Sequence, residues 1–582
     1  MKKNFKLDPA IKSYFLGPQA ENAPLIKKLG NFIFAHWFDW RKRLYPSDGV
    51  AITHTDQLSP EFQANVEKLK YEVLDLVTRL QKEVPSFSPR YIGHMVSEIS
   101  IPALIGHIIN LLHNPNNITG EVARVGIEIE REAIAVLMTM LGYDPEVGRG
   151  HFTSGGTVAN IEGLVRARAR LARWMAAGIV TEQTSATKTS LFEYAHQGWD
   201  SFNKLAAAHS DDEIKACHFL HYSPIEVAKK IDRLFNIDYR GPVVLAPQSK
   251  HYSWPKGIIL LGLGAEAFWP IELDEHALLS VKDLKLKVEK ARAENRPILT
   301  VVSVAGTTEL GDFDPIHEVQ NYLDELKSKE GIHIWHHVDA AYGGFFRCLP
   351  KSKDTPVQEK TFKALAAIPG ANSITIDPHK LGYVPYASGA FLCKNTSEYY
   401  IAPFDAPYLR FDYDSHRLPQ TLEGSRSSGG AMATWLTARC IGFNENGYGK
   451  ILEQTIWQRK NLEDKLRKAH PDIRIAPHSQ TNILCFAVAK SGESLKTSNL
   501  IAEKIYDEFS HEGPVPFFVS MTSLKFESYR AYLDEFVKEW AALVDDKKVT
   551  LLRLTLMNPF FESTDTSINY GDEFVKELLA VI

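Results

Sequence analysis

The stretch Ser373-Ile-Thr-Ile-Asp377-Pro378-His379-Lys380 decides how the rest of the chain is interpreted. Its first four residues are rich in β-branched side chains and predict a short buried strand. Proline disfavours helical backbone in the residue before it, so the strand should end at Asp377. His379 and Lys380 would then lie in a turn at the carboxyl end of a strand, which is where open α/β sheets bind their ligands.

A lysine in such a crevice has a specific chemical use. Removal from water lowers the pKa of its amine, and the neutral amine is a nucleophile toward aldehydes. The alternative is a solvated lysine in a surface loop, which is where most lysines lie. Lys380 is therefore a candidate nucleophile whose assignment depends on other stretches of the chain.

The composition is that of a large globular protein. The chain has 582 residues, of which 44% are hydrophobic and 24% charged, and its net charge is −5. These values predict several domains with a large core. They do not indicate a nucleic-acid-binding protein or a basic membrane patch. We expect neither a signal peptide nor a membrane span, since no apolar run is long enough. The five cysteines are scattered without a CxxC pair, which favours a reducing, cytoplasmic setting.

A second informative stretch is Thr153-Ser154-Gly155-Gly156-Thr157. An amphipathic helix follows it, which we expect to run to about Ala177 with Gly178 as its cap. The amides and the dipole at such a helix start favour an anion such as phosphate. The spacings of a Walker loop and of a dinucleotide fingerprint are both missing. The alternative is an ordinary capped helix.

A third stretch is His336-His337-Val338-Asp339-Ala-Ala341. A strand ends here in a carboxylate followed by small residues, so Asp339 could hold a positive group of a ligand. The alternative is a helix-cap or turn aspartate. Neighbours in a strand face opposite ways, so His336 and His337 cannot bind one metal ion together. Histidines elsewhere lack ligand spacing, and no metal site is predicted.

Strand and helix patterns alternate from about residue 150 to 395, which implies parallel βαβ units. Strands are expected at 243–247, 258–263, 298–304, 373–376 and 388–393. From residue 450 onward, helices alternate with strands at 482–488 and 549–557, which is typical of a smaller α+β domain. Near the N-terminus, Ser59-Pro60-Glu61 predicts a helix start. That helix should carry an apolar face of Val66, Leu69, Val73, Leu76 and Leu80.

Several expected strands thus end in groups that could hold a ligand, namely His251, Thr307, Asp339 and Lys380. An aldehyde-bearing, phosphorylated and cationic aromatic cofactor needs this set. The lysine would form a Schiff base, the carboxylate would keep a pyridine nitrogen protonated, and an imidazole could stack on the ring. The glycine turn would take the phosphate.

The chain resembles the group II pyridoxal phosphate-dependent decarboxylases from about residue 90 to its end. The motifs that carry the resemblance are TSGGTVANIEGL at 153–164, PQSKHYSW at 247–254, HVDAAYGG at 337–344 and DPHK at 377–380. Within the family, GHMVSE at 93–98, LEGS at 422–425 and the extension of DPHK to LGYVPYASG look closest to bacterial tyrosine decarboxylases.

The resemblance implies an α/β protein of fold type I, similar to aspartate aminotransferase, with a large mixed but mostly parallel sheet. It implies an N-terminal helical arm and dimerisation segment at 1–145, a large pyridoxal phosphate-binding domain at 146–415 and a small α+β C-terminal domain at 416–582. The implied assembly is a homodimer with shared active sites, without nucleic acid or membrane.

The resemblance also implies a role for individual residues. Lys380 binds the aldehyde of pyridoxal 5'-phosphate, Asp339 pairs with the pyridine nitrogen, Ala341 packs against the ring and His251 stacks on its opposite face. Thr307 lies near the ring substituents. The implied phosphate contacts are Ser154, Gly155, Gly156, Thr157 and His379, with Ser427 and Ser428 reaching the neighbouring subunit's cofactor.

For the substrate, the resemblance implies contacts from Tyr91, His94 and Thr555. Tyr408, in the segment that corresponds to a mobile catalytic loop, would return a proton to carbon after carbon dioxide leaves, and Tyr413 is its competitor.

The implied reaction is decarboxylation of an aromatic L-amino acid, with tyrosine giving tyramine as the first expectation and dopa or phenylalanine next. Glutamate or another acidic substrate is an alternative that needs a cation near the substrate side chain, for which Arg90, Arg410 and Arg553 are candidates. A variant that forms an aldehyde is a further alternative, as is a catalytically silent binding homologue.

Overall fold

The computed structural model describes residues 6–351, 355–402, 421–510, 513 and 515–582. Its largest sheet has seven strands in the order β1-β7-β6-β5-β4-β2-β3. They are β1 (Arg149–Thr153), β7 (Gly389–Cys393), β6 (Ser373–Ile376), β5 (His336–Asp339), β4 (Ile298–Val304), β2 (Val243–Pro247) and β3 (Phe268–Ile271). Strand β7 runs antiparallel to β1 and β6, and the other pairs are parallel. The expected mixed, mostly parallel sheet is confirmed.

Helices cover both faces of this sheet because its buried strands expose apolar side chains to both sides. In β2, Val244 and Ala246 pack in one apolar cluster with the long helix α7 (Gly156–Thr184). Val243 and Leu245 point the other way, into a cluster with α13 (Val281–Ala293) and α14 (Ile316–Glu330). Further helices of this region are α8 (Leu191–Ala195), α9 (Gly198–Ala206), α10 (Asp211–Lys215), α11 (Pro224–Phe235), α12 (Ser253–Leu260), α15 (Glu359–Ala367) and α16 (Thr396–Tyr399).

A second, antiparallel sheet has four strands in the order β11-β13-β9-β8. They are β11 (Ser520–Lys525), β13 (Lys548–Thr555), β9 (Ile483–Val488) and β8 (Ile473–Ile475). The helices of this part are α18 (Tyr448–Ala469), α19 (Leu495–Glu508), α20 (Phe526–Lys538) and α21 (Tyr570–Val581), and a short strand pair joins β10 (Glu493–Ser494) and β12 (Ala541–Leu543). The two sheets fall within the ranges expected for a large and a small domain, whose boundaries stay a prediction.

Two expectations were wrong. The apolar run 258–263 is not a strand, since residues up to Leu260 belong to α12. A short apolar run fits either structure, and Pro255 in the first turn of α12 needs no amide partner there. The expected cap Gly178 lies inside α7, which continues to Thr184. Gly178 is required for packing instead, because a Cβ atom there would overlap the Tyr194 side chain.

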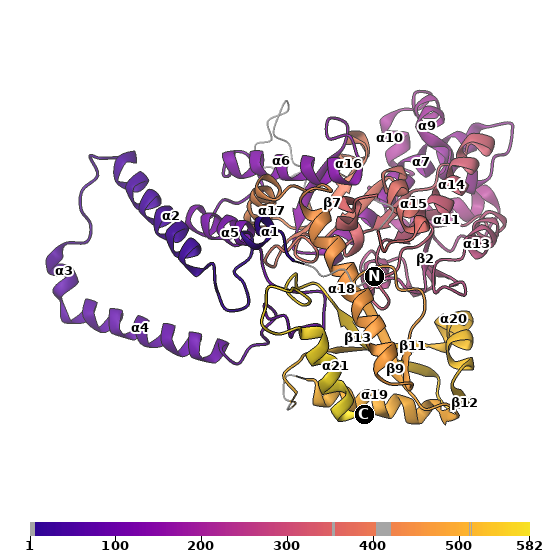
Figure 1. Cartoon of the computed structure of the whole chain (residues 1–582). Helices are drawn as coiled ribbons and strands as arrows, with labels where there is room; N and C mark the ends of the chain where they lie inside the picture. The colour runs from indigo at the N-terminus through magenta and orange to yellow at the C-terminus, as the bar shows by residue number, and fades with distance from the viewer. Residues whose placement is uncertain (1–5, 352–354, 403–420, 511–512, 514) are drawn as a thin grey trace.

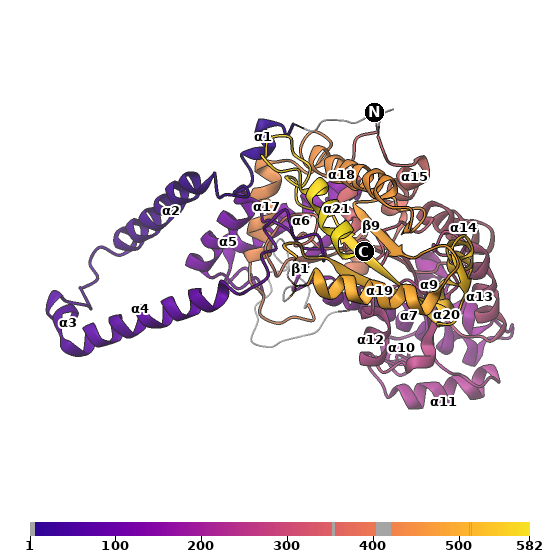
Figure 2. The ribbon, with the colours of Figure 1, turned by 60° about the horizontal axis from the view of Figure 1, so that its bottom comes forward.

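The N-terminal part contains α1 (Pro9–Lys12), α2 (Ala23–Leu44), α3 (His54–Leu58), α4 (Pro60–Leu80), α5 (Ile101–His113) and α6 (Arg124–Leu141). The predicted start of α4 is confirmed, since the Ser59 hydroxyl accepts a hydrogen bond from the Phe62 amide. Helices α2, α3 and α4 project from the rest of the chain (Figures 1 and 2), and none of them contains a buried residue. We call residues 23–80 the arm.

Helices α5 and α6 pack against α17 (Gly429–Cys440) near the base of the arm. A buried ion pair ties this region together, in which the Arg426 guanidinium donates to the Glu130 carboxylate at 2.5 Å. The same carboxylate accepts from the Asn117 side chain and from the Phe152 amide. Glu130 thus joins α6, β1 and the start of α17.

Within the described residues, no helix is long and apolar enough to cross a membrane. All five cysteines are free thiols, and four of them are buried.

We expect Glu130→Gln to destabilise the protein by about 3–5 kcal/mol, because it leaves the buried Arg426 charge unpaired. The midpoint and slope of urea unfolding measure this change. Glu67→Gln is the matched control, since the Glu67–Lys70 pair is about two-thirds exposed on α4 and exposed pairs contribute little. Equal midpoints for the two variants would contradict the structural role of Glu130.

Candidate active site

A cavity of about 440 Å³ lies where several strands end. Strand β2 leads to Ser249 and His251, β4 ends at Val304, β5 ends at Asp339, and β6 leads to Lys380. The turn before α7 closes another side. The described lining residues are Met95, Ser154, Gly155, Gly156, Thr157, Val158, Asn160, Ser249, His251, Tyr252, Val304, Gly306, Thr308, Asp339, Ala341, Tyr342, Asp377, His379, Lys380 and Tyr386.

Lys380 follows β6 as the sequence predicts, and its ammonium nitrogen lies 3.1 Å from Oδ2 of Asp377. The Ser388 amide donates to Nδ1 of His379, which leaves Nε2 of that ring facing the same carboxylate at 3.4 Å. Burial alone would raise the pKa of Asp377, but the charge of Lys380 and the hydrogen bond from His379 outweigh it and lower the pKa. The lysine is therefore held beside a buried, ionised carboxylate.

Asp339 ends β5 with its carboxylate almost fully buried. Oδ2 accepts hydrogen bonds from Asn160 Nδ2 at 2.8 Å and from Trp254 Nε1 at 3.2 Å. Oδ1 accepts from the Ala341 amide at 3.3 Å. Three donors from three segments thus orient this carboxylate at the cavity wall, where it can face a protonated ring nitrogen.

The turn at the start of α7 has the features of an anion site. Gly155 is the N-cap of this 29-residue helix, so the first amides of the helix are free to donate. The Ser154 amide donates to the Glu423 carboxylate at 3.0 Å, so an anionic group already lies at the turn. Residue 156 must be a glycine, because a Cβ atom there would lie 2.8 Å from Asp377 Oδ2.

These residues fit pyridoxal 5'-phosphate. The cavity brings together an amine, a buried acceptor carboxylate, an imidazole and an anion-binding turn, which are the partners that its aldehyde, pyridine nitrogen, ring and phosphate require. Ser154, Gly155, Gly156, Thr157, His251, Asp339, Ala341, His379 and Lys380 all line this one cavity.

Three expected cofactor contacts do not line it. Thr307 is buried and stabilises its own turn, since its hydroxyl accepts from the Asp312 amide at 3.2 Å, whereas the neighbouring Gly306 and Thr308 reach the cavity. Ser427 Oγ accepts from the Asn110 side chain, and the Ser428 hydroxyl donates to Asn117. The expected reach of both serines toward a neighbouring subunit stays a prediction. Tyr408 and its competitor Tyr413 lie outside the described residues.

The expected substrate residues cluster beside the cavity without lining it. The Gly93 carbonyl accepts hydrogen bonds from Thr555 Oγ1 at 3.0 Å and from Arg553 Nη1 at 3.3 Å. The His94 amide donates to the Tyr91 hydroxyl. Met95, in the same loop, is the residue that lines the cavity. The roles of Tyr91, His94 and Thr555 stay predictions.

Sequence reasoning missed Asn160, Trp254 and Tyr386. Asn160 and Trp254 donate to Asp339, and the Tyr386 ring lies 4.3 Å from the His379 ring, between centroids. The signal for Asn160 was available, because it lies one helical turn after Gly156 and must face the same side of α7. Trp254 follows His251 closely in the motif PQSKHYSW. Tyr386 follows the lysine turn without a pattern of its own.

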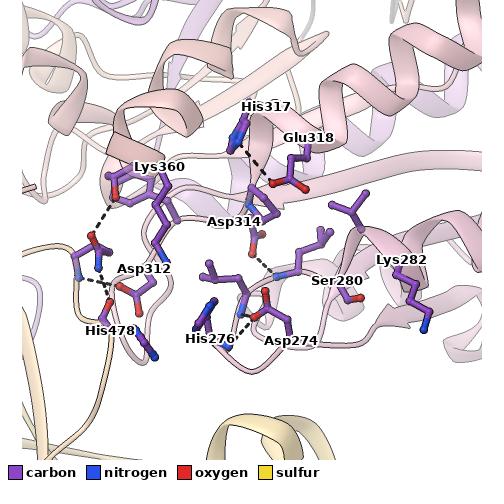
Figure 3. Close-up of a pocket in the computed structure, with 17 residues that line it drawn as sticks. Asp274, His276, Ser280, Lys282, Asp312, Asp314, His317, Glu318, Lys360 and His478 are labelled. Atoms are coloured by element: carbon purple, nitrogen blue, oxygen red, sulfur yellow. Dashed lines mark hydrogen bonds and ion pairs between the residues drawn. The ribbon is translucent and has the colours of Figure 1, made fainter. Parts of the chain in front are cut away.

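A second cavity, of about 310 Å³, lies near the 306–312 turn (Figure 3). Asp274, His276, Asp312, Lys360 and His478 are among its lining residues. Burial raises the pKa of Asp312 to about 8, and the Asp312 carbonyl accepts from the amides of Gly306 and Thr307. The first residues of α13 and α14 also line this cavity, and Asp312 connects it to the wall of the active site.

The comparisons with known proteins agree with this site. Residues 233–489, which include His251, Asp339 and Lys380, match the pyridoxal-dependent decarboxylase conserved domain. The chain is 29% identical to an L-tyrosine decarboxylase of Enterococcus faecium, over 98% of each chain. It is 29% identical to an L-tyrosine decarboxylase of Levilactobacillus brevis, over 98% of this chain and 96% of that one. It is 27% identical to an aspartate 1-decarboxylase of Aliivibrio fischeri, over 76% and 71%.

Solved structures show the fold. Tryptophan decarboxylase of Catharanthus roseus in complex with L-tryptophan aligns with a TM-score of 0.62 at 15% identity, over 96% of this chain and 99% of that one. Mouse CSAD aligns with a TM-score of 0.62 at 19% identity, over 86% and 85%. The expected fold type I is confirmed. Residues 233–489 thus match a pyridoxal-dependent decarboxylase domain, and the chain is an amino-acid decarboxylase whose cofactor is pyridoxal 5'-phosphate.

Proposed function

We propose that the chain decarboxylates an aromatic L-amino acid, with tyrosine as the first substrate, giving tyramine and carbon dioxide, and with dopa as a further one. One observation carries the proposal. Among the described residues that line the cavity, Lys380 is the only lysine or arginine, and Met95, Tyr252, Tyr342 and Tyr386 supply apolar and aromatic walls. An aromatic side chain can pack there, whereas a side-chain carboxylate would lack a partner charge.

The protein's own residues account for the chemistry. Pyridoxal phosphate, when bound, supplies the electron sink for the bond that releases carbon dioxide. Lys380 is the amine that would bind its aldehyde. The Asp339 carboxylate would hold a proton at the pyridine nitrogen, which would stabilise the negative charge that develops as the bond breaks. His251 would pack against the ring, and the turn from Gly155 to Thr157 would hold the phosphate.

A proton must then be returned to the substrate carbon. We assign this step to Tyr408, with Tyr413 as the alternative in the same segment. If neither tyrosine served, the aldehyde-forming variant of the reaction would become the better assignment.

Arg553 favours a second candidate, decarboxylation of an acidic amino acid. Its side chain is 5% exposed, and within the described part of the chain Nε and Nη2 have no hydrogen-bond partner. The similarity to an aspartate 1-decarboxylase points in the same direction. The other described candidate, Arg90, is engaged elsewhere, because its guanidinium lies over the Phe517 ring at 4.9 Å.

Carbon dioxide release from single amino acids distinguishes the two candidates. We expect the reconstituted enzyme to release carbon dioxide from tyrosine and dopa, with a kcat/KM at least about 100-fold above that for aspartate or glutamate, since a charge buried without a partner costs several kcal/mol. Release mainly from an acidic substrate, lost in Arg553→Met, would overturn the aromatic assignment and establish the second candidate.

We also propose that two copies of the chain form a dimer through the arm, in a cytoplasmic setting as the free cysteines suggest. The apolar face predicted for α4 is exposed in a single chain, with Leu69 64% and Leu76 57% accessible, and α2 exposes Phe34 and Phe38. Exposed apolar faces such as those of α4 and α2 are normally covered by a partner. A second copy would also bring its Ser427 and Ser428 into reach of a shared site.

Leu69→Glu combined with Leu76→Glu should convert the dimer to a monomer, because two charges would be buried in the apolar contact. Sedimentation velocity measures the mass. Lys68→Glu with Glu72→Lys, which exchanges two charges on the same helix, is the control and should leave the dimer intact. A wild-type monomer, or a double-glutamate variant that still dimerises, would contradict the role of the arm.

A further inference from the structure

A continuous line of buried hydrogen bonds connects Asp339 to His251. Asn160 Nδ2 donates to Asp339 Oδ2 at 2.8 Å and to Ser253 Oγ at 2.9 Å. Ser253 Oγ lies 2.9 Å from Nδ1 of His251. Asn160 and Ser253 are both at most 1% exposed, so water does not offer these groups another partner. One amide therefore stands between the two groups that should contact the cofactor ring.

The orientation of the Asn160 amide follows from its neighbours. Asp339 is a carboxylate that already accepts from Trp254 and Ala341, so the group facing it must be a donor. The NH₂ group of Asn160 then serves Asp339 and Ser253 with its two hydrogens, and its oxygen faces Nε2 of His337 at 3.2 Å. The reverse orientation would place two oxygens against each other.

The His337 ring fixes the orientation of the Asn160 amide. Burial lowers the pKa of His337 to about 3, so its ring is neutral and carries one hydrogen. Trp335 Nε1 donates to Ser373 Oγ at 2.9 Å, which leaves the Ser373 hydroxyl to donate to His337 Nδ1 at 2.7 Å. The hydrogen of His337 is then on Nε2, which lies 3.2 Å from the oxygen of Asn160 and 3.2 Å from the hydroxyl of Thr375. Gly163 on α7 makes room for this ring, since a Cβ atom there would lie 2.7 Å from Nδ1.

The same hydrogen-bond argument determines which ring nitrogen of His251 carries the hydrogen. Because Ser253 Oγ accepts from Asn160, its own hydrogen is free to point to Nδ1 of His251. The Ser253 amide lies 3.3 Å from the same nitrogen. Nδ1 is therefore an acceptor, and the neutral ring carries its hydrogen on Nε2.

We propose that Asn160 is a positioning residue that, through one side-chain amide oriented by His337, holds both the Asp339 carboxylate and the tautomer of His251 in the arrangement the cofactor ring needs. This inference rests on pyridoxal phosphate binding in the cavity and is independent of the substrate. It also explains a buried histidine that does not line the cavity yet lies two residues before Asp339 on the same face of β5.

Four variants test the proposal, with the dissociation constant of pyridoxal phosphate for the apoprotein and the absorbance band of the bound cofactor as readouts. Asn160→Asp keeps the shape but removes both donors and sets a second carboxylate beside Asp339. His337→Phe fills the space without a donor, whereas His337→Gln can still donate to Asn160. Ser253→Ala disconnects His251 and leaves the bond from Asn160 to Asp339 intact.

We expect the dissociation constant to rise about tenfold or more in Asn160→Asp and His337→Phe, because each disturbs a hydrogen bond to a buried charge or its support. The absorbance band should shift in both. His337→Gln should restore wild-type affinity to within about threefold, and Ser253→Ala should fall between these limits.

The outcomes of these measurements distinguish a failure of this inference from a failure of the cofactor assignment. Wild-type protein that never binds the cofactor would overturn the inference together with the assignment. Wild-type protein that binds it, with His337→Gln no better than His337→Phe, would overturn the positioning role alone, since packing would then be all that matters. If Asn160→Asp does not fold, the two His337 variants still distinguish a positioning role from packing alone.

Discussion

The buried Asp377 carboxylate is the constraint on which the active site depends. A carboxylate that is 2% exposed must be compensated by nearby groups, and the Lys380 ammonium supplies the charge while the His379 ring faces the same carboxylate. The backbone must also approach closely, because Cβ atoms at Gly156 and at Gly389 would each lie 2.8 Å from an Asp377 oxygen. One side chain thus dictates where the lysine lies, where α7 starts and how closely β7 passes.

Two carboxylates at this buried edge of the sheet differ in their partners. Asp377 is held by the Lys380 ammonium and the His379 ring, and it keeps Lys380 in place. Asp339, one strand away in the sheet, accepts from neutral donors on Asn160, Trp254 and Ala341, so its charge is available to a cationic ring nitrogen. This difference suits a cofactor that carries a positive ring and must also meet an amine.

Much of this arrangement could be predicted from the sequence, because local rules dictate it. Pro378 ends β6 where the restriction on the preceding residue requires, and β2 and β4 are apolar runs of strand length between helices. The run 258–263 could not be assigned, since a short apolar segment fits a helix equally well. Gly178 was misinterpreted because its role is a contact with Tyr194, sixteen residues away, which no local pattern reveals.

In the site, strand ends identified Lys380, Asp339 and His251, whereas Tyr386 depends on a ring contact that only the folded chain shows. Tyr408 is still a prediction.

The most direct measurement is the absorbance spectrum of the purified protein after reconstitution with pyridoxal phosphate, in the wild type, Lys380→Ala and Lys250→Ala. Lys250 is a suitable control because it also follows a strand, β2, but its ammonium group lies over the Phe268 ring. The account predicts a band beyond the protein absorbance in the wild type and in Lys250→Ala, and its loss in Lys380→Ala. A band that persists in Lys380→Ala, or that is absent from the wild type, would contradict Lys380 as the residue that binds the cofactor.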